Sequence, residues 1–183
     1  WNADGKDIYY QGTISKALPV DLKVSYELDG KPVSAESLAG KSGKVTIRFD
    51  YTNNQYKNVS IDGKNTKIYV PFVMLTGLLL DNDIFTNVEI SNGKIINDGD
   101  RIIAVGFALP GMQENLNLSR DKVDIPDFVE ITADVNNFAL SNTLTVAANS
   151  IISDLDVSKL DSADDLQASL TELSSAMSKL MDG

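Results

Sequence analysis

The sequence contains no cysteine and no histidine among its 183 residues. Without these residues the chain cannot form a disulfide, and it lacks the usual ligands of a zinc site. The same absences exclude nucleophilic catalysis by a Ser-His or Cys-His pair. We therefore expect no cofactor and no enzyme of these classes, although the 26 acidic residues leave open a hydrolase that uses carboxylates alone.

Basic residues are scarce too, since 16 lysines and arginines stand against 26 acidic residues and give a net charge of −10. Nucleic-acid phosphates and anionic lipids both attract clusters of Lys and Arg, so neither is an expected partner. Long apolar runs are also lacking. The apolar stretch at 68–80 has 13 residues and contains Pro71 and Gly77, so it is too short to span a bilayer and is typical of a buried strand.

Alternation of apolar and polar residues predicts two strands in the first third of the chain, because successive strand side chains point to opposite faces. The core-facing positions of the first are Leu22, Val24, Tyr26 and Leu28. Those of the second are Val45, Ile47, Phe49 and Tyr51. Between them, Asp29-Gly30 predicts a turn, and Ser34 and Gly40 predict the N-cap and the end of a single helical turn.

Turn signals and short apolar stretches continue to residue 148. Asn92-Gly93 and Asp98-Gly99 are typical of two-residue hairpin turns and bracket residues 94–97. Residues 101–109 are apolar on both faces, which predicts a central strand covered on both sides. Strands are also expected at 129–135 and 143–148. The pattern predicts a mainly β domain over residues 1–150, an antiparallel β-sandwich of Ig-like architecture.

The end of the chain has a different pattern. Acidic residues gather at 151–162, which we expect to be a linker, and an amphipathic helix is predicted over 163–183. Its apolar positions follow a 4-3-4-3 spacing and form a helix seam of Leu166, Leu170, Leu173, Met177 and Leu180. This coiled-coil-like seam favours the truncated start of a helical stalk or bundle. The alternative is that the helix packs back on the β domain, because an isolated helix of this length is marginal.

Two acidic turns are weak candidates for a metal site. Asp81-Asn82-Asp83 and Asp98-Gly99-Asp100 offer carboxylates from Asp81, Asp83, Asp98 and Asp100 that would suit calcium if the loops converge. Neither has the spacing of an EF-hand, and Asp and Asn are common in turns because they tolerate the required backbone angles. We therefore expect no metal ion here.

Three other constellations of residues could carry chemistry. Aromatic residues that could form a platform for sugar rings are Trp1, Tyr9, Tyr10, Tyr51 and Tyr56, with Tyr51 expected to face inward. A Lys–Asn isopeptide bond would need Lys23 or Lys44 beside a late asparagine (Asn136, Asn137 or Asn142). Both lysines fall on the polar side of their strands, which disfavours it. Ser91 and Lys94 match Ser-x-x-Lys, but across a predicted turn and not at a helix start.

Four stretches together carry a family resemblance: residues 34–53, 85–93, 105–111 and 124–134. They resemble the extracellular head of uncharacterised membrane-anchored surface proteins of Gram-positive gut Firmicutes. In that group a secreted β region is followed by Leu-rich helical repeats and a membrane anchor. A more distant likeness is to the phage-infection-protein group, which carries long heptad-bearing ectodomains. The resemblance implies a location, on the outside of a Gram-positive cell, and it implies no catalytic residues.

The expected protein is thus a non-catalytic extracellular module on the cell surface of a Gram-positive bacterium. The resemblance implies a membrane-anchored parent. The sequence begins at Trp1 with neither an initiator Met nor a signal peptide and is therefore expected to be an excerpt. It would act as a structural or interaction head on a helical stalk, in adhesion for example, with an unknown protein or cell-surface partner. The alternative is a glycan- or cell-wall-binding module.

Overall fold

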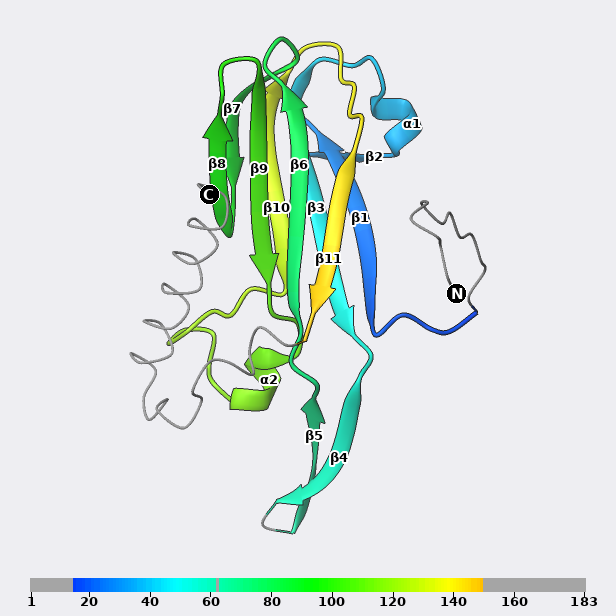
Figure 1. The fold of residues 1–183 in the computed structure, drawn as a ribbon, viewed down its shortest axis with the longest axis vertical. Helices are drawn as coiled ribbons and strands as arrows, with labels where there is room; N and C mark the ends of the chain where they lie inside the picture. Colours follow the sequence, from blue (N-terminus) through cyan, green and yellow to red (C-terminus); the bar gives the residue numbers. More distant parts are fainter. Residues whose placement is uncertain (1–14, 62, 150–183) are drawn as a thin grey trace, which may run out of the picture.

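The computed structural model describes residues 15–61 and 63–149. Within these residues the chain forms two antiparallel sheets that pack face to face, together with a separate two-stranded hairpin (Figure 1). The prediction of a mainly β, antiparallel fold that fits a β-sandwich is therefore confirmed at this level. The linker at 151–162, the helix at 163–183 and its seam lie outside the described residues.

The sheets draw their strands from distant parts of the chain. The first sheet has the order β2 (Lys31–Val33), β1 (Val20–Leu28), β3 (Gly43–Asn53), β10 (Phe128–Val135) and β7 (Phe85–Ile90). The second has the order β11 (Thr143–Ala148), β6 (Val73–Asp81), β9 (Arg101–Ala108) and β8 (Gly93–Asn97). The hairpin consists of β4 (Tyr56–Ile61) and β5 (Lys64–Tyr69). The two helices are short, α1 (Ala35–Leu38) and α2 (Met112–Leu116).

The core lies between the two sheets and follows the alternation of their strands. On β3 the predicted inward residues are all buried: Val45, Ile47, Phe49 and Tyr51. On β10 the same holds for Val129, Ile131, Ala133 and Val135. Leu22 is the exception to the predicted pattern, because its side chain is 41% exposed. It belongs to β1, whose main contacts are with its own sheet neighbours and α1, so the opposite sheet does not cover this position.

The turn and cap predicted near the start are confirmed. Asp29 and Gly30 both adopt positive φ angles and join β1 to β2 in a hairpin where Leu28 pairs with Lys31. Ser34 caps α1, since its Oγ accepts a hydrogen bond from the Ser37 amide at 3.2 Å. Gly40 follows the helix with a φ of +73°.

The prediction of a hairpin turn at Asn92-Gly93 is wrong. β7 pairs with β10 in the first sheet and β8 pairs with β9 in the second, so this dipeptide carries the chain from one sheet to the other. Neither residue has a positive φ angle. Gly93 is instead required by close packing, because a Cβ at this position would lie 2.1 Å from the carbonyl oxygen of Val105. Asp98-Gly99 does lie in a hairpin loop, between β8 and β9.

The central strand at 101–109 is covered on both sides over part of its length. One face of β9 contributes Ile102 and Ala104 to the core between the sheets. On the other face Phe107 is buried in a second apolar cluster with Val123 and Ile125, which belong to the segment after α2. Gln113 holds that segment in place, because its buried amide bonds three backbone groups, those of Leu118, Val123 and Ile125. In the described residues no helix is long and apolar enough to cross a membrane.

Candidate interaction surfaces

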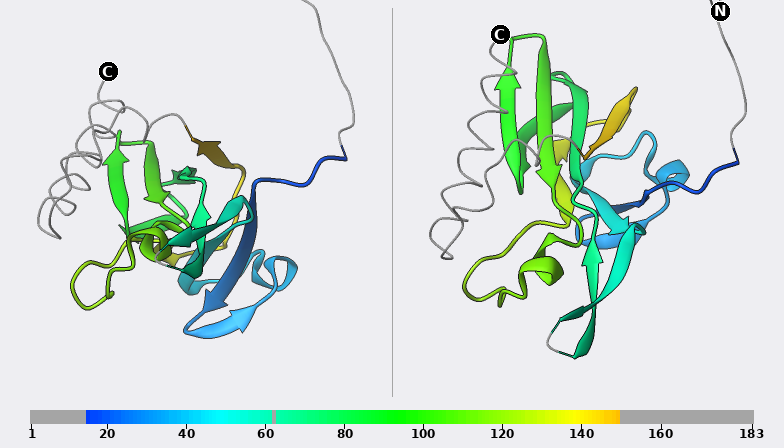
Figure 2. Two further views of the ribbon diagram at one scale, coloured as in Figure 1. Left: turned by 90° about the horizontal axis from the view of Figure 1, so that it is seen from below. Right: turned by 60° about the horizontal axis from the view of Figure 1, so that its bottom comes forward.

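The hairpin of β4 and β5, called the arm below, projects beyond the end of the two sheets (Figures 1 and 2). Every residue of β4 is exposed. The arm carries three lysines, at 57, 64 and 67, against a single acidic residue, Asp62, in a chain whose net charge is −10. It is therefore a local positive element on an acidic protein.

The pairing of β4 with β5 gives the arm two chemically different sides. Tyr56 pairs with Tyr69 and Asn58 with Lys67, which places these four residues on one side. There the two tyrosine rings meet edge to face at 5.7 Å, and the Lys67 ammonium lies 4.4 Å from the centre of the Tyr56 ring. We call this the aromatic side of the arm.

The opposite side of the arm presents apolar side chains beside Lys57 and Lys64. Val59 and Ile61 are exposed there at 36% and 49%, and Ile68 is half-buried beside them. β-branched side chains on a projecting hairpin are costly to leave in water unless something covers them. We call this the apolar side of the arm.

Two asparagines fix the base of the arm to the body. The Asn53 side chain is only 7% exposed, and its Nδ2 donates to the carbonyls of Val70 and Pro110 at 2.8 and 3.0 Å. Its Oδ1 accepts from the Gln55 amide at 2.9 Å. Asn115, at the end of α2, bonds both backbone groups of Tyr69, at 2.7 and 2.9 Å. The arm is thus held at both strands where it leaves the sheets.

The aromatic residues singled out in the sequence do not form one platform in the described part of the chain. Tyr51 is buried between the sheets, where its hydroxyl bonds that of Thr76, which also bonds Thr145. Burial raises the pKa of the Tyr51 phenol above its ordinary value, against the opposing effect of these hydroxyl hydrogen bonds. Tyr56 lies on the arm, and its aromatic neighbour is Tyr69. Trp1, Tyr9 and Tyr10 lie outside the described residues.

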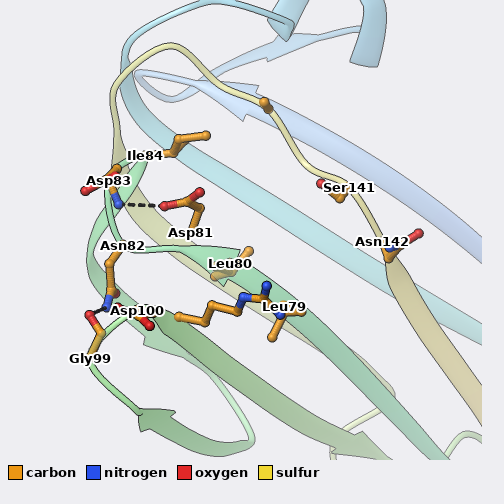
Figure 3. Close-up of a pocket in the computed structure, with 12 residues that line it drawn as sticks. Leu79, Leu80, Asp81, Asn82, Asp83, Ile84, Gly99, Asp100, Ser141 and Asn142 are labelled. Carbon is orange, nitrogen blue, oxygen red and sulfur yellow. Dashed lines mark hydrogen bonds between the residues drawn. The ribbon is translucent and has the colours of Figure 1, made fainter.

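The two acidic turns converge at the other end of the molecule, as a metal site would require. The Nδ2 of Asn82 donates to the Gly99 carbonyl at 2.8 Å and to the Oδ1 of Asn97 at 3.0 Å, which ties the β6–β7 turn to the β8–β9 loop. Three of the four candidate carboxylates (Asp81, Asp83 and Asp100) line a cleft of about 590 Å³ there (Figure 3). Ser141 and Asn142 complete its far wall.

Two of the four candidate carboxylates, those of Asp81 and Asp98, accept hydrogen bonds from the backbone. Asp81 accepts a hydrogen bond from the Asp83 amide at 2.8 Å, drawn in Figure 3. Asp98 is not among the residues that line the cleft, and it accepts hydrogen bonds from the backbone amides of Asp100 and Arg101. Among the described residues no group of three or more His, Cys, Asp or Glu side chains could hold a metal ion. The cleft is therefore a loop-built hollow stabilised by turn hydrogen bonds.

The remaining chemical candidates do not assemble into sites. Ser91 lies at the crossing between the sheets, where its hydroxyl accepts from the Glu130 amide at 2.9 Å. Lys23 and Lys44 are exposed, as the alternation predicted. Asn136 is engaged by the Ser42 hydroxyl at 3.1 Å. No step of acyl transfer or isopeptide formation is organised by these contacts.

The arm was missed from the sequence, although a signal for it exists. Asp62-Gly63 is an Asp-Gly pair between two short stretches with β-favouring residues, which is the usual mark of a two-residue hairpin. Ile61 does pair with Lys64 across it. The sequence gives no sign, however, that this hairpin leaves the sheets, because that depends on which strands its neighbours join.

Comparison of the chain with protein-family models, with curated proteins and with solved structures finds no match.

Proposed function

We propose that this chain is a non-catalytic interaction module of a surface-tethered Gram-positive protein, and that the arm is its contact element. In this proposal a two-sheet body of Ig-like architecture acts as a rigid mount, and a helical stalk reached through residues 163–183 connects it to a membrane-anchored parent. The proposed location at the cell surface is supported by the resemblance to exported surface proteins. That resemblance is carried by residues 34–53, 85–93, 105–111 and 124–134.

The observation that carries the proposal is the exposure of apolar side chains on a firmly mounted arm. Val59 and Ile61 are presented to solvent by a hairpin whose base is fixed by Asn53 and Asn115. A mounted hairpin loses little conformational entropy on binding, which favours affinity for a given contact area. The partner that fits is a protein whose surface has an apolar patch surrounded by acidic residues. Its patch would cover Val59 and Ile61, and its acidic residues would face Lys57 and Lys64.

The aromatic side of the arm supports the alternative, a glycan- or cell-wall-binding module. Tyrosine faces stack on sugar rings, and the amide of Asn58 and the ammonium of Lys67 are donors that suit hydroxyl or phosphate groups. Both functions use the same arm but opposite sides of it, so substitutions can separate them.

The test is retention of the purified protein on Gram-positive cells and on isolated cell walls. We expect the pair Val59→Ser and Ile61→Ser to reduce retention on cells about tenfold or more, and protease treatment of the cells to abolish it. Tyr56→Ala, on the other side, is the matched control and should leave retention unchanged. Binding to protein-free walls that is lost with Tyr56→Ala would instead establish the glycan alternative. Retention that neither change affects would refute the arm as the contact element.

A further inference from the structure

The outer faces of the two sheets differ in polarity. On the first sheet the outer face carries ionic groups such as Arg48, which bonds Asp50 and Glu130 across β3 and β10. On the second sheet the outer face is apolar. Its members, called the outer apolar face below, are Leu75, Leu79, Ile103, Val105, Leu144 and Val146.

The register shows that these residues share one surface. Leu79 pairs with Ile103 on β9, and Leu75 pairs with Val146 on β11, so three adjacent strands contribute. Leu79, Leu144 and Val146 are exposed at 42%, 65% and 44%. Among the eight large apolar side chains that are exposed in the described residues, three lie on this face and three on the arm.

A glycine lies at the centre of the outer apolar face. Gly77 lies on β6 between Leu75 and Leu79 and pairs with Leu144 and Val105 on the two sides. A Cβ at Gly77 would meet nothing within 4 Å. The space above Gly77 is therefore open to a side chain from another layer.

One end of the second sheet is already covered on this side by a further layer. Val73 and Phe107 are buried there under Val123 and Ile125, with α2 alongside (Figure 1). Leu75 and Val105 pack against this cluster, so the open part of the outer apolar face consists of Leu79, Ile103, Leu144 and Val146. A sheet covered at one end and apolar at the other indicates that the layer continues.

The chain itself contains a segment that fits this surface. It leaves the second sheet at Ala148, the last residue of β11, which is an edge strand of that sheet. Residues 163–180 follow, with the helix seam of five apolar side chains. From Leu166 to Leu180 a helix would be about 22 Å long. The uncovered part of β9, residues 101–105, spans about 17 Å, so about three turns of the helix would lie on it.

Charge is complementary as well. By its pairing with Val105, Lys94 lies on the same side of the second sheet as the outer apolar face, and so do Arg101 and its strand partner Asp81, which leaves one net positive charge. Between residues 153 and 183 the chain has seven acidic and two basic residues. A second copy of the chain is a weaker occupant, because each copy carries a net charge of −10 and the tethered segment has a far higher local concentration.

We propose that residues 163–180 form a helix that packs its seam, Leu166 to Leu180, on the outer apolar face and so completes a third layer of the body. This packing fixes the direction in which the chain leaves the body. It is independent of the arm and of whatever the arm binds.

Hydrogen–deuterium exchange of the full chain tests the proposal, with a synthetic peptide of residues 160–183 as the reference. In the full chain the amides of 166–180 should exchange at least about tenfold more slowly than in the peptide, because an isolated helix of this length is marginal. Leu170→Asp on the seam and Leu79→Asp on the sheet should each abolish that protection. Val146→Asp serves as a second change on the sheet.

Two matched variants control for the added charge. Thr171→Asp lies off the seam, and Leu22→Asp alters a leucine that is as exposed as Leu79 but belongs to the first sheet. Both should keep the protection, and circular dichroism confirms that each variant is folded. Exchange as fast as in the peptide would overturn the proposal. So would protection that survives both Leu79→Asp and Val146→Asp, or protection that disappears on dilution and so comes from a second copy.

Discussion

Gly93 on β8 and Gly77 on β6 lie on the two sides of β9, and glycine has a different structural role at each position. Gly93 pairs with Gly106 and has the backbone of β9 against it, whereas Gly77 pairs with Val105 and faces open space. The Asn-Gly signal was misread because a dipeptide reports local backbone preference and nothing about distant strands. Only the fold shows that Gly93 is needed for close approach.

Gly93→Ala should destabilise the protein by about 3 kcal/mol, at the upper end of overpacking effects, because the new methyl group meets backbone that cannot move aside. Gly77→Ala, in the same sheet, should change the free energy of unfolding by less than about 1 kcal/mol. Urea denaturation of the two variants measures both. Equal effects would contradict the packing described for Gly93.

The buried hydroxyl of Tyr51 predicts a specific alkaline transition. Folding raises the pKa of this phenol, so its contribution to stability is complete below about pH 10 and is lost as the pH rises further, when the unfolded state ionises first. We expect the melting temperature to fall more steeply above pH 10 in the wild type than in Tyr51→Phe. Tyr56→Phe, on the exposed arm, is the control and should follow the wild type.

At neutral pH, Tyr51→Phe removes one hydrogen bond but leaves Thr76 bonded to Thr145, so its cost should be about 1 kcal/mol. A loss above about 3 kcal/mol would show that the hydroxyl of Tyr51 does more than bridge the sheets.

At the scale of elements, the arm is the hairpin that projects from the two-sheet body. Strands with clear alternation were predicted because their signal is local: β1, β3, β10 and β11 appear where the pattern placed them. Which strands pair could not be predicted, since β3 binds β10 across 75 or more residues of sequence. The hydrogen bonds at the base of the arm could not be predicted for the same reason, because Asn53 and Asn115 bond backbone groups that are distant in the sequence.

Asn53→Ala should loosen the arm before it unfolds the body. It leaves two carbonyls and one amide at the base without the partners they have now, which costs about 2–3 kcal/mol. Amide exchange in β4 and β5 should therefore accelerate more than exchange in β3 or β10. Asn58→Ala, on the exposed part of the arm, should stay within about 0.5 kcal/mol of the wild type. Uniform acceleration across all strands would contradict a local mount.

At the scale of the whole molecule, apolar surface is concentrated in two places, the arm and the outer apolar face, while the outer face of the first sheet is ionic. Composition alone could not predict this division. It arises from topology, because β6 and β9 are apolar on both sides but only one end of their outer side is covered by the segment after α2. The two acidic turns do converge, which was the predicted condition for a metal site. The carboxylates of Asp81 and Asp98, however, accept hydrogen bonds from backbone amides.

We propose different roles for the two apolar regions, contact with a partner for the arm and internal packing for the outer apolar face. The central claim is that the arm makes the contact. An armless protein tests it most directly, and the fold allows one, because the Val70 amide bonds the Gln55 carbonyl at 2.8 Å just below the arm. Residues 56–69 can be replaced by Asn-Gly, a two-residue turn that suits such a closure.

The decisive measurement is retention of this armless protein on Gram-positive cells beside the wild type, with cooperative thermal unfolding as proof that the body is intact. The account predicts a folded protein whose retention falls to background. A folded armless protein that is retained as well as the wild type would contradict it.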